Sequence, residues 1–551
     1  MATKRASTGK KSKVVATPPV AGHGAEKSGR LTPPPGGVAV RMYRHGLGDC
    51  LLLALAKEKD KDAPFYIMID CGVILGTEDA KGKIGQVLDN VHAATGGRLD
   101  VLVVTHEHWD HVSGFAQAKD RFAPAGASGR APGVLEIERV WMGWTEDPSD
   151  KDAKAIRSDR AKKQQGLAAA LQEYERHKKL GLATNEELPA GVGNLLSFFG
   201  MEMDAASGLF GAHGGTTNSA LENARGFGRT APRYCRPDDK PWSHEDLPDF
   251  RIFALGPPLS DRLLRKTFAK AEVYHAALSA APADSFFAAA GGLEIEGETP
   301  EDLHECYCPF DPALGAANLD ALKTLVHGSA AAARTAAAAG LPLGEPNSVV
   351  EFFDRHYWGR GPDAAPDQSW RRIDSDWLDA SREFALQLDS ATNNTSLVLA
   401  IELVKSGKVL LFAADAQVGS WLSWQDLEWK LDAATTVTGP DLLKRTVFYK
   451  VGHHGSHNAT LKEKGLELMR QDEFVAFIPV NHQMAKDKGW GNMPLPSLVT
   501  ELGERAKGRV VRIDEDFDLA KLKTRDAKIG KDFEQRLFAD EGKLFYDYHL
   551  D

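Results

Sequence analysis

Short apolar stretches separated by polar turns predict two groups of β-strands along this chain. Alternating or continuous apolar runs are typical of strands, and apolar positions spaced by three and four are typical of helices. The first group of predicted strands covers residues 38–46, 50–56, 63–70 and 99–104, with a helical pattern at 85–94 before the last of them. A strand at 249–256 precedes a second group at 395–403, 407–413, 445–451, 473–480 and 508–512. We therefore expect an α/β fold in which two sheets face each other, with helices outside.

The region between the two groups is less regular. Residues 158–182 have the spacing of a helix with one charged face, and residues 192–206 predict another. Pro257 and Pro258 end the strand before them, and an Ala-rich stretch further on favours helix. The pattern divides the chain into a disordered basic tail (1–37), a first half of the main domain (38–258), a largely helical insertion (259–375) and a second half with a C-terminal extension (376–551).

Composition is typical of a soluble globular protein. The chain has 551 residues, of which 42% are hydrophobic and 26% charged, and no apolar run approaches the length of a membrane span. The N-terminal segment lacks the apolar stretch of a secretory signal, and five cysteines suit a reducing compartment, so we expect a cytoplasmic protein without membrane contact. The net charge of −10 argues against broad, non-specific nucleic-acid binding, whereas the basic tail is either a solvated arm or a tether.

The strand at 99–104 runs directly into the sequence HEHWDH. Because alternate residues of an extended segment point to the same side, His106 and His108 can bind one ion together. Asp110 and His111 follow in the next turn, where they can reach a second ion. Imidazole and carboxylate are ligands that zinc accepts, so this stretch predicts a metal site.

This H-x-H-x-D-H stretch after a strand resembles the signature of the metallo-β-lactamase superfamily. Further motifs follow the order found in the metallo-β-lactamase domain of the ComEC/Rec2 DNA-uptake proteins and their free-standing relatives, namely RHGLGDCLLL, IMIDCG, LGPP, TNNTSLVLA, LLFAADA and VGHHGS. The resemblance implies a four-layer αββα sandwich. It also implies a hydrolase that uses two Zn²⁺ ions, or Mn²⁺ in their place, to activate a hydroxide.

The resemblance assigns roles to individual residues. Asp70 would orient a metal-binding histidine, and Asp415 would bridge the two ions. One of His453 and His454 would complete the second metal while its neighbour contacts substrate; we favour His453 as the ligand. Three further roles concern the reaction itself. Asp110 or Asp415 would position the nucleophile, and His454, Ser456 or His457 would donate to the substrate. Asn394, beside Asn393, would reach the metals or a phosphate.

The chain departs from the broad superfamily in two places. Many members have another histidine for the first metal, and here the histidines in the corresponding span do not follow an apolar strand: His177, His213, His244, His275, His304, His327 and His356. His213, in a glycine-rich segment, is the best of these candidates, but an ordinary loop histidine is the alternative. Near the C-terminus, Met493 precedes Pro494 where ComEC-like domains often have histidine.

The metal ligands alone do not name a substrate, because one such site hydrolyses phosphodiesters, lactones and thioesters. The ComEC-like motif order favours a phosphodiesterase or nuclease acting on DNA or another nucleotide phosphodiester. The acidic body and the long insertion favour a small-molecule hydrolase, acting on a lactone, a thioester or a cyclic nucleotide. A non-catalytic metal-binding protein is the third alternative.

Overall fold

The computed structural model describes residues 29–59, 63–124, 132–179, 187–203, 210–212, 216–266, 272, 355–356, 377–490 and 493–551. The candidate His213 and nearly all of the predicted insertion lie outside these residues. Residues 29–37, which the sequence places in the tail, are described, and Leu31 is buried with its amide bonded to the carbonyl of Ala94. Among the described residues, no helix combines the length and the apolar character needed to cross a membrane.

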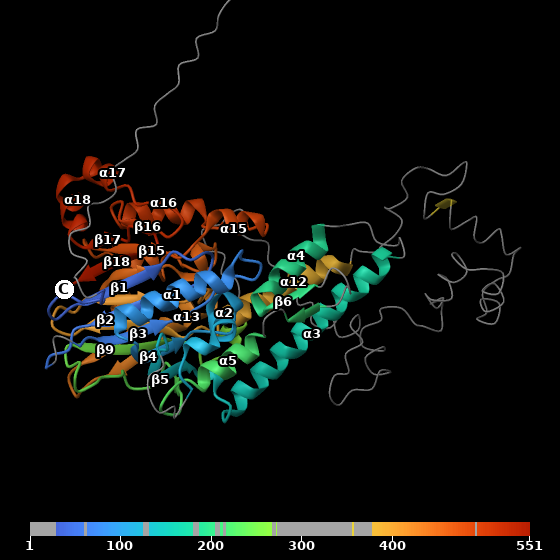
Figure 1. The fold of residues 1–551 in the computed structure, drawn as a ribbon, viewed down its shortest axis with the longest axis horizontal. Coiled ribbons are helices and arrows are strands. Elements are labelled where there is room, and N and C mark those ends of the chain that lie inside the picture. Colours follow the sequence, from blue (N-terminus) through green and yellow to red (C-terminus); the bar gives the residue numbers. More distant parts are fainter. Residues whose placement is uncertain are drawn as a thin grey trace, which may run out of the picture.

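The first sheet has eight strands in the order β17-β18-β1-β2-β3-β4-β5-β8 (Figure 1). Pairing is antiparallel from β17 to β3 and parallel from β3 to β8. The strands are β1 (Val38–Tyr43), β2 (Leu51–Leu55), β3 (Phe65–Ile69), β4 (Arg98–Val104), β5 (Glu136–Gly143), β8 (Arg233–Cys235), β17 (Leu537–Ala539) and β18 (Phe545–Leu550).

The second sheet has six strands in the order β16-β15-β14-β11-β10-β9. Strands β16, β15, β14 and β11 are parallel, and β10 is antiparallel to both β11 and β9. Their bounds are β9 (Phe250–Gly256), β10 (Val398–Leu403), β11 (Val409–Phe412), β14 (Thr446–Lys450), β15 (Val475–Ile478) and β16 (Val510–Arg512). Two small hairpins, β6 (Met201–Met203) with β7 (Phe210–Ala212) and β12 (Glu428–Lys430) with β13 (Thr436–Thr438), stand apart.

Three apolar clusters define the layers. The central cluster joins alternate residues of both sheets, such as Leu53, Val101, Leu399 and Phe448. A second cluster packs α1 (Ala80–Thr95), α2 (Trp109–Gln117) and α5 (Thr217–Arg225) on the outer face of the first sheet. A third packs α13 (Val418–Trp424), α14 (Gly439–Lys444), α15 (His482–Asp487) and α16 (Pro496–Arg505) on the outer face of the second. The predicted four-layer αββα sandwich is therefore confirmed.

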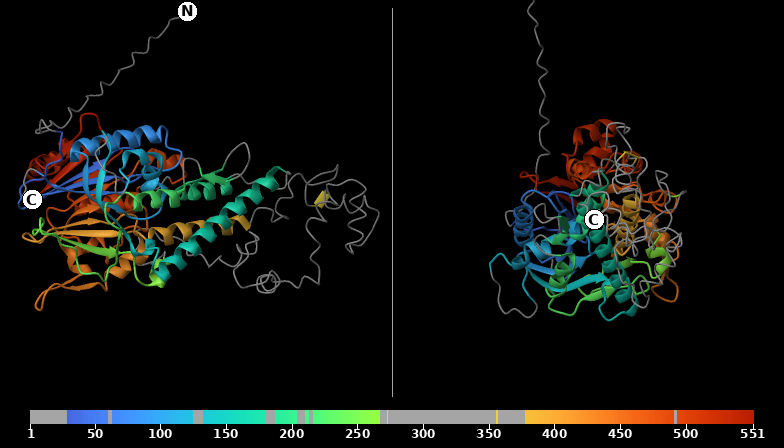
Figure 2. Two further views of the ribbon diagram at one scale, coloured as in Figure 1. Left: turned by 60° about the horizontal axis from the view of Figure 1, so that its bottom comes forward. Right: turned by 90° about the vertical axis from the view of Figure 1, so that its right-hand side faces the viewer.

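Three helices extend from one end of the sandwich as an arm (Figures 1 and 2). They are α3 (Lys151–Lys179), α4 (Glu187–Leu196) and α12 (Trp377–Asn393), and they share a small apolar cluster. At the other end α17 (Leu519–Arg525) and α18 (Ala527–Glu534) lie against the central core. The short α6 (Asp261–Leu264) follows β9.

The helix predicted at 192–206 ends earlier than expected. Helix α4 stops at Leu196, a 3₁₀ turn covers Ser197–Phe199, and β6 begins at Met201. Gly200 separates them with φ of +71°, in the left-handed region where a side chain is disfavoured. A Cβ atom there would lie 2.8 Å from the Trp109 ring, so glycine also permits close packing on α2.

Candidate metal centre

The predicted site residues meet where strands from the two sheets end. Asp70 follows β3, and the HEHWDH segment follows β4. Asp415 follows β11, and His453 and His454 follow β14. These strands belong to the parallel parts of their sheets, whose carboxyl ends open at one edge and commonly carry ligand sites.

The HEHWDH segment changes from strand to helix within its own length. His108 is extended, with φ −62° and ψ 144°, and caps helix α2, while Asp110 and His111 lie in the first helical turn. Trp109 is fully buried beneath them. This local change brings the rings of His106 and His111 to 4.2 Å and those of His106 and His108 to 4.8 Å.

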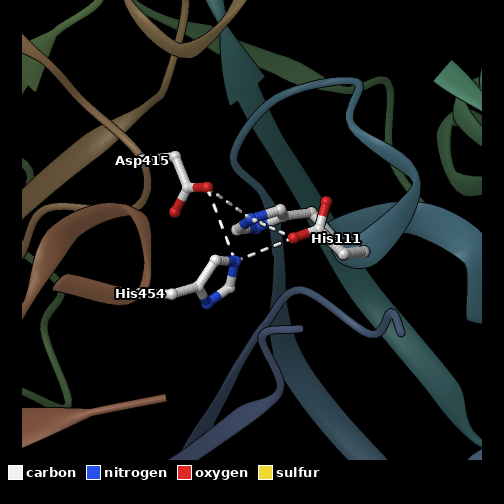
Figure 3. A group of neighbouring side chains, drawn as sticks. His111, Asp415 and His454 are labelled. Atoms are coloured by element: carbon white, nitrogen blue, oxygen red, sulfur yellow. Dashed lines mark hydrogen bonds and ion pairs between the residues drawn. The ribbon is translucent and has the colours of Figure 1, made fainter. Parts of the chain in front are cut away.

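Four buried side chains form the centre of the site: Asp110, His111, Asp415 and His454. Figure 3 shows His111, Asp415 and His454 converging from different elements. His111 Nε2 lies 3.1 Å from Asp415 Oδ2, and His454 Nε2 lies 2.8 Å from Asp110 Oδ2 and 3.8 Å from Asp415 Oδ2. All four offer one ligand atom within 4.8 Å of the others, so this group has the composition and compactness to hold a metal ion.

Asp70 fixes the ring orientation of two histidines. Its Oδ2 accepts from His111 Nδ1 at 2.8 Å and from the Thr105 hydroxyl at 2.6 Å, while its Oδ1 accepts from the Thr105 amide. Because the Thr105 hydroxyl donates its one proton to Asp70, its oxygen is the acceptor for His106 Nδ1 at 3.1 Å. Both histidines therefore direct Nε2 toward the site, as metal-binding imidazoles do when a carboxylate binds the other nitrogen.

Asp415 is held by the chain on one side and faces the histidines with the other. Its Oδ1 accepts from the His453 amide at 3.1 Å and lies 3.5 Å from Lys450 Nζ. His453 and His454 reach this arrangement through left-handed backbone, with φ of 41° and 51°. Lys450 is buried, donates to the Ala414 carbonyl and forms an ion pair with Asp49, so it balances part of the negative charge of the site.

His453 and His454 are held in different ways. His454 Nδ1 donates to the Pro479 carbonyl at 2.6 Å, which leaves Nε2 as the nitrogen facing Asp110 and Asp415. His453 Nδ1 is contacted by Gln417 Nε2 at 3.0 Å and by the Ser456 hydroxyl at 2.8 Å. We favoured His453 as the ligand, but the geometry places His454 in the four-residue group instead.

Burial and charge divide the histidines into two electrostatic classes. Burial, reinforced by neighbouring imidazoles, lowers the pKa of His108 to about 3 and of His453 to about 4, and the pKa of His106 falls well below its usual value. Burial also opposes charge on His111 and His454, but Asp415 and Asp110 outweigh it and raise both pKa values. His111, His454 and Lys450 in turn hold the pKa of Asp415 well below its usual range despite burial.

Several buried polar atoms at the site have no hydrogen-bond partner. They are His106 Nε2, His108 Nδ1 and Nε2, His111 Nε2, Asp110 Oδ1, Asp389 Oδ1, Asp415 Oδ2 and His453 Nε2. Unpaired buried polar atoms are costly, and here imidazole nitrogens and carboxylate oxygens are concentrated in one place. This donor set fits divalent metal ions of the borderline class, zinc above all.

The other predicted residues have different surroundings. Asn394 donates to the carbonyls of Leu264 and Lys266 and accepts from the amides of Gln417 and Ser420. Both of its polar atoms are thus bonded to backbone, and these contacts do not support the prediction that Asn394 reaches the metals or a phosphate. Ser456 contacts His453 and Asn458, so its hydroxyl helps to hold the His453 ring in place.

The sequence did not point to Lys450, Gln417 or Asp389. Lys450 lies within an apolar strand, Gln417 lies close after Asp415, and Asp389 lies within helix α12. Their roles depend on contacts between distant segments, which no local pattern contains. Among the third-histidine candidates, His244 stacks on Trp242 and Phe65, away from the HEHWDH rings in its described contacts.

Residues 65–191 match the family model of the metallo-beta-lactamase superfamily. The match covers β3, β4 and the whole HEHWDH segment, and members of this superfamily are generally hydrolases that bind metal ions. No curated protein matches the chain. Residues 65–191 are thus similar to this superfamily, and the fold and the buried His and Asp groups suited to metal are consistent with that similarity.

Proposed function

We propose that this protein is a metal-dependent hydrolase of phosphodiester bonds, acting on DNA or on another nucleotide phosphodiester. The observation that carries the hydrolase assignment is the convergence of the buried ligand atoms of Asp110, His111, Asp415 and His454 within 4.8 Å of one another, beside the unpaired ring nitrogens of His106 and His108. The choice of phosphodiesters is supported by the order of motifs shared with the ComEC/Rec2 proteins. Two ions, Zn²⁺ or Mn²⁺, would be held by His106, His108, Asp110, His111, Asp415 and His454.

The chain's own residues would prepare the reaction. A metal held by these residues would lower the pKa of a water molecule toward neutrality and would stabilise negative charge that develops on oxygen. Asp70, through Thr105, keeps the imidazoles of His106 and His111 in the ligating orientation. Lys450 and the His453 amide hold Asp415 in place, which spares the site from rearranging during turnover.

His453 is suited to donate a hydrogen bond to substrate. Asn458 Nδ2 donates to Gln417 Oε1 at 2.6 Å, and this fixes the Gln417 amide so that its Nε2 donates to His453 Nδ1. With Nδ1 accepting, the neutral ring carries its proton on Nε2, which has no partner within the described structure. That N–H is available for a phosphate oxygen or for the leaving group.

The test is hydrolysis of bis-p-nitrophenyl phosphate by the full chain with zinc or manganese. We expect turnover by the wild type and none by His108→Ala or Asp415→Ala. Absence of turnover with both metals would refute the phosphodiesterase assignment. Cleavage of plasmid and single-stranded DNA, measured next, separates a nuclease from an enzyme for small nucleotides.

A small-molecule hydrolase is the second candidate, favoured by the net charge of −10, which repels polyanions. Turnover of a lactone or a thioester, combined with no turnover of bis-p-nitrophenyl phosphate, would establish the small-molecule hydrolase in place of the phosphodiesterase.

A further inference from the structure

Helix α12 brings a buried carboxylate to the first-metal side of the site. Asp389 is 5% exposed, and its Oδ1 lies 3.8 Å from His108 Nε2. That separation is too long for a hydrogen bond, and neither atom has another partner. Two ligand atoms that share a tetrahedral zinc ion, each about 2 Å from it, lie about 3.3 Å apart. The separation of this pair is a few tenths of an ångström wider, so a small inward movement of either side chain would let both bind one cation.

Asp389 is also oriented for this role. Its Oδ2 accepts from Asn393 Nδ2 at 3.1 Å, one helical turn further on, and this contact directs Oδ1 away from Asn393. A ligating carboxylate commonly has its second oxygen bonded in this way. His108 is confined from the other side by Phe198 and Phe199, whose ring centroids lie 5.3 and 4.9 Å from its own.

We propose that Asp389 is a metal ligand, which shares an ion with His108 on the first-metal side of the site. The third histidine that the broad superfamily uses at this position is then replaced by a carboxylate from a different element. Neighbouring carboxylates on one small site keep their negative charge only beside compensating positive charge, which a divalent ion provides. The site thus has a nitrogen-rich first half with one acid, and a second half formed by Asp110, His111, Asp415 and His454.

The experiment compares metal binding by wild type, Asp389→Asn and Asp389→His, each stripped of metal and then titrated with zinc against a chromophoric chelator. We expect two zinc ions per wild-type chain. Asp389→Asn should retain one at wild-type affinity and bind the other at least about 10 to 100 times more weakly. Asp389→His restores the superfamily's ligand type and should recover part of that loss. Cobalt in place of zinc reports the same change as altered visible absorption.

Glu107→Gln is the matched control. Glu107 is a buried acid within the same HEHWDH segment, but it pairs with Arg160 at 2.6 Å and accepts from Gln164. The Glu107→Gln variant should leave both zinc affinities unchanged. Thermal melting of the metal-free proteins identifies any variant that fails to fold. A folded Asp389→Asn protein that binds two zinc ions as tightly as wild type would overturn the proposal, as would a wild type that takes up only one.

The proposal rests on the metal centre of the proposed function but not on its substrate. Loss of one zinc ion in Asp389→Asn, combined with no phosphodiester cleavage by wild type, would refute the proposed function and leave this inference intact. Cleavage by wild type, combined with unchanged zinc binding in Asp389→Asn, would support the proposed function and overturn this inference.

Discussion

At the scale of single residues, two adjacent histidines differ through the atoms that contact their Nδ1. His454 Nδ1 faces a carbonyl, which can only accept, whereas His453 Nδ1 faces the amide nitrogen of Gln417, which can only donate, and the Ser456 hydroxyl, which can do either. Donation from Gln417 gives the two rings opposite tautomers, with the lone pair of Nε2 directed to the metal site in His454 and a proton on Nε2 in His453.

This difference predicts separate effects of the two alanine variants. His454→Ala should lower the affinity for one zinc ion by at least about 100-fold, because a ligand is removed. His453→Ala should keep both zinc ions and instead lower kcat by about 10²-fold or more, because a donor to the substrate is removed. Metal content by elemental analysis and steady-state kinetics measure the two effects. Zinc loss in His453→Ala with full retention in His454→Ala would reverse the assignment.

The lowered pKa of His108 predicts how the metal-free protein responds to acid. Burial keeps the folded pKa at about 3, below the ordinary value of 6.5, so the unfolded chain binds a proton first as the pH falls. The stability associated with His108 is therefore complete above pH 6.5 and is lost progressively down to pH 3. Between pH 7 and 4.5 this one group should cost the wild type roughly 3 kcal/mol.

The variant His108→Gln removes this titration. Guanidinium unfolding in the presence of chelator, at pH 7 and 4.5, should show a smaller acid-induced loss for the variant by about that amount. Any constant destabilisation by glutamine cancels in the difference between the two pH values. Parallel losses in both proteins would show that His108 does not resist protonation.

At the scale of elements, the loops after β1 and β3 hold the first turn of α2 through backbone contacts. The Asp49 amide donates to the Asp110 carbonyl, and the Cys71 amide donates to the His111 carbonyl. Gly72 lies so close that an added Cβ would be 2.4 Å from the Asp110 carbonyl carbon and 2.5 Å from the His111 amide. Contact with backbone on this scale cannot be relieved by a side-chain rotation.

Gly72→Ala should therefore displace the metal-binding turn itself. We expect a loss of about 1 to 3 kcal/mol in the free energy of unfolding, together with weaker zinc binding. Gly85→Ala is the control, because Gly85 lies within helix α1 with open space around its Cα. It should be neutral or stabilising by up to about 1 kcal/mol and leave zinc binding unchanged. Denaturant unfolding and chelator competition measure both; equal behaviour of the two variants would contradict the steric argument.

Helices and strands were predictable from the sequence where one apolar pattern ran through the whole element. They were less predictable where contacts between distant segments determine the local structure. Strands β1 to β4 and helix α1 follow the predicted order, because each has a clear period. Strand β5 was missed, since charged and apolar residues mix in it, and its parallel pairing with β4 and β8 stabilises it. The site shows the same division: the HEHWDH motif is local, whereas Asp389 and Lys450 gain their roles from segments distant in sequence.

At the scale of the whole molecule, the arm is joined to the metal centre by all three of its helices. Arg160 of α3 pairs with Glu107, Phe198 and Phe199 follow α4 and pack on His108, and Asp389 of α12 faces His108. The sandwich supplies the second half of the site through both sheets, and the arm borders the first. Metal binding at His108 is thereby coupled to the positions of Phe198, Phe199 and Asp389, whereas the Arg160–Glu107 pair attaches the arm to the sandwich without contacting a ligand atom.

The opposite end of the sandwich carries a second long-range connection. Strand β18 pairs with β1, and Asp547 accepts from Arg41 through both oxygens at 2.7 Å, with the two side chains 11% and 6% exposed. Arg41 also donates to Asn90 and lies over the Phe545 ring. This ion pair joins β1 to β18 within the first sheet. It lies at a distance from the metal residues, because β2 separates these two strands from β3 and β4, which those residues follow.

Asp547→Ala should consequently affect stability without affecting metal. It leaves the Arg41 guanidinium buried with its main acceptor removed, and breaking a buried pair from one side costs about 3 to 5 kcal/mol. Asp472→Ala, which breaks the exposed pair with Lys507, should give no measurable change, because water and salt screen that pair. Denaturant unfolding at pH 7 compares the two, and zinc titration of the folded fraction should match wild type in both. A loss of zinc affinity in Asp547→Ala would mean that the pairing of β1 with β18 and the geometry of the metal centre are coupled through β1 and the loop that carries Asp49.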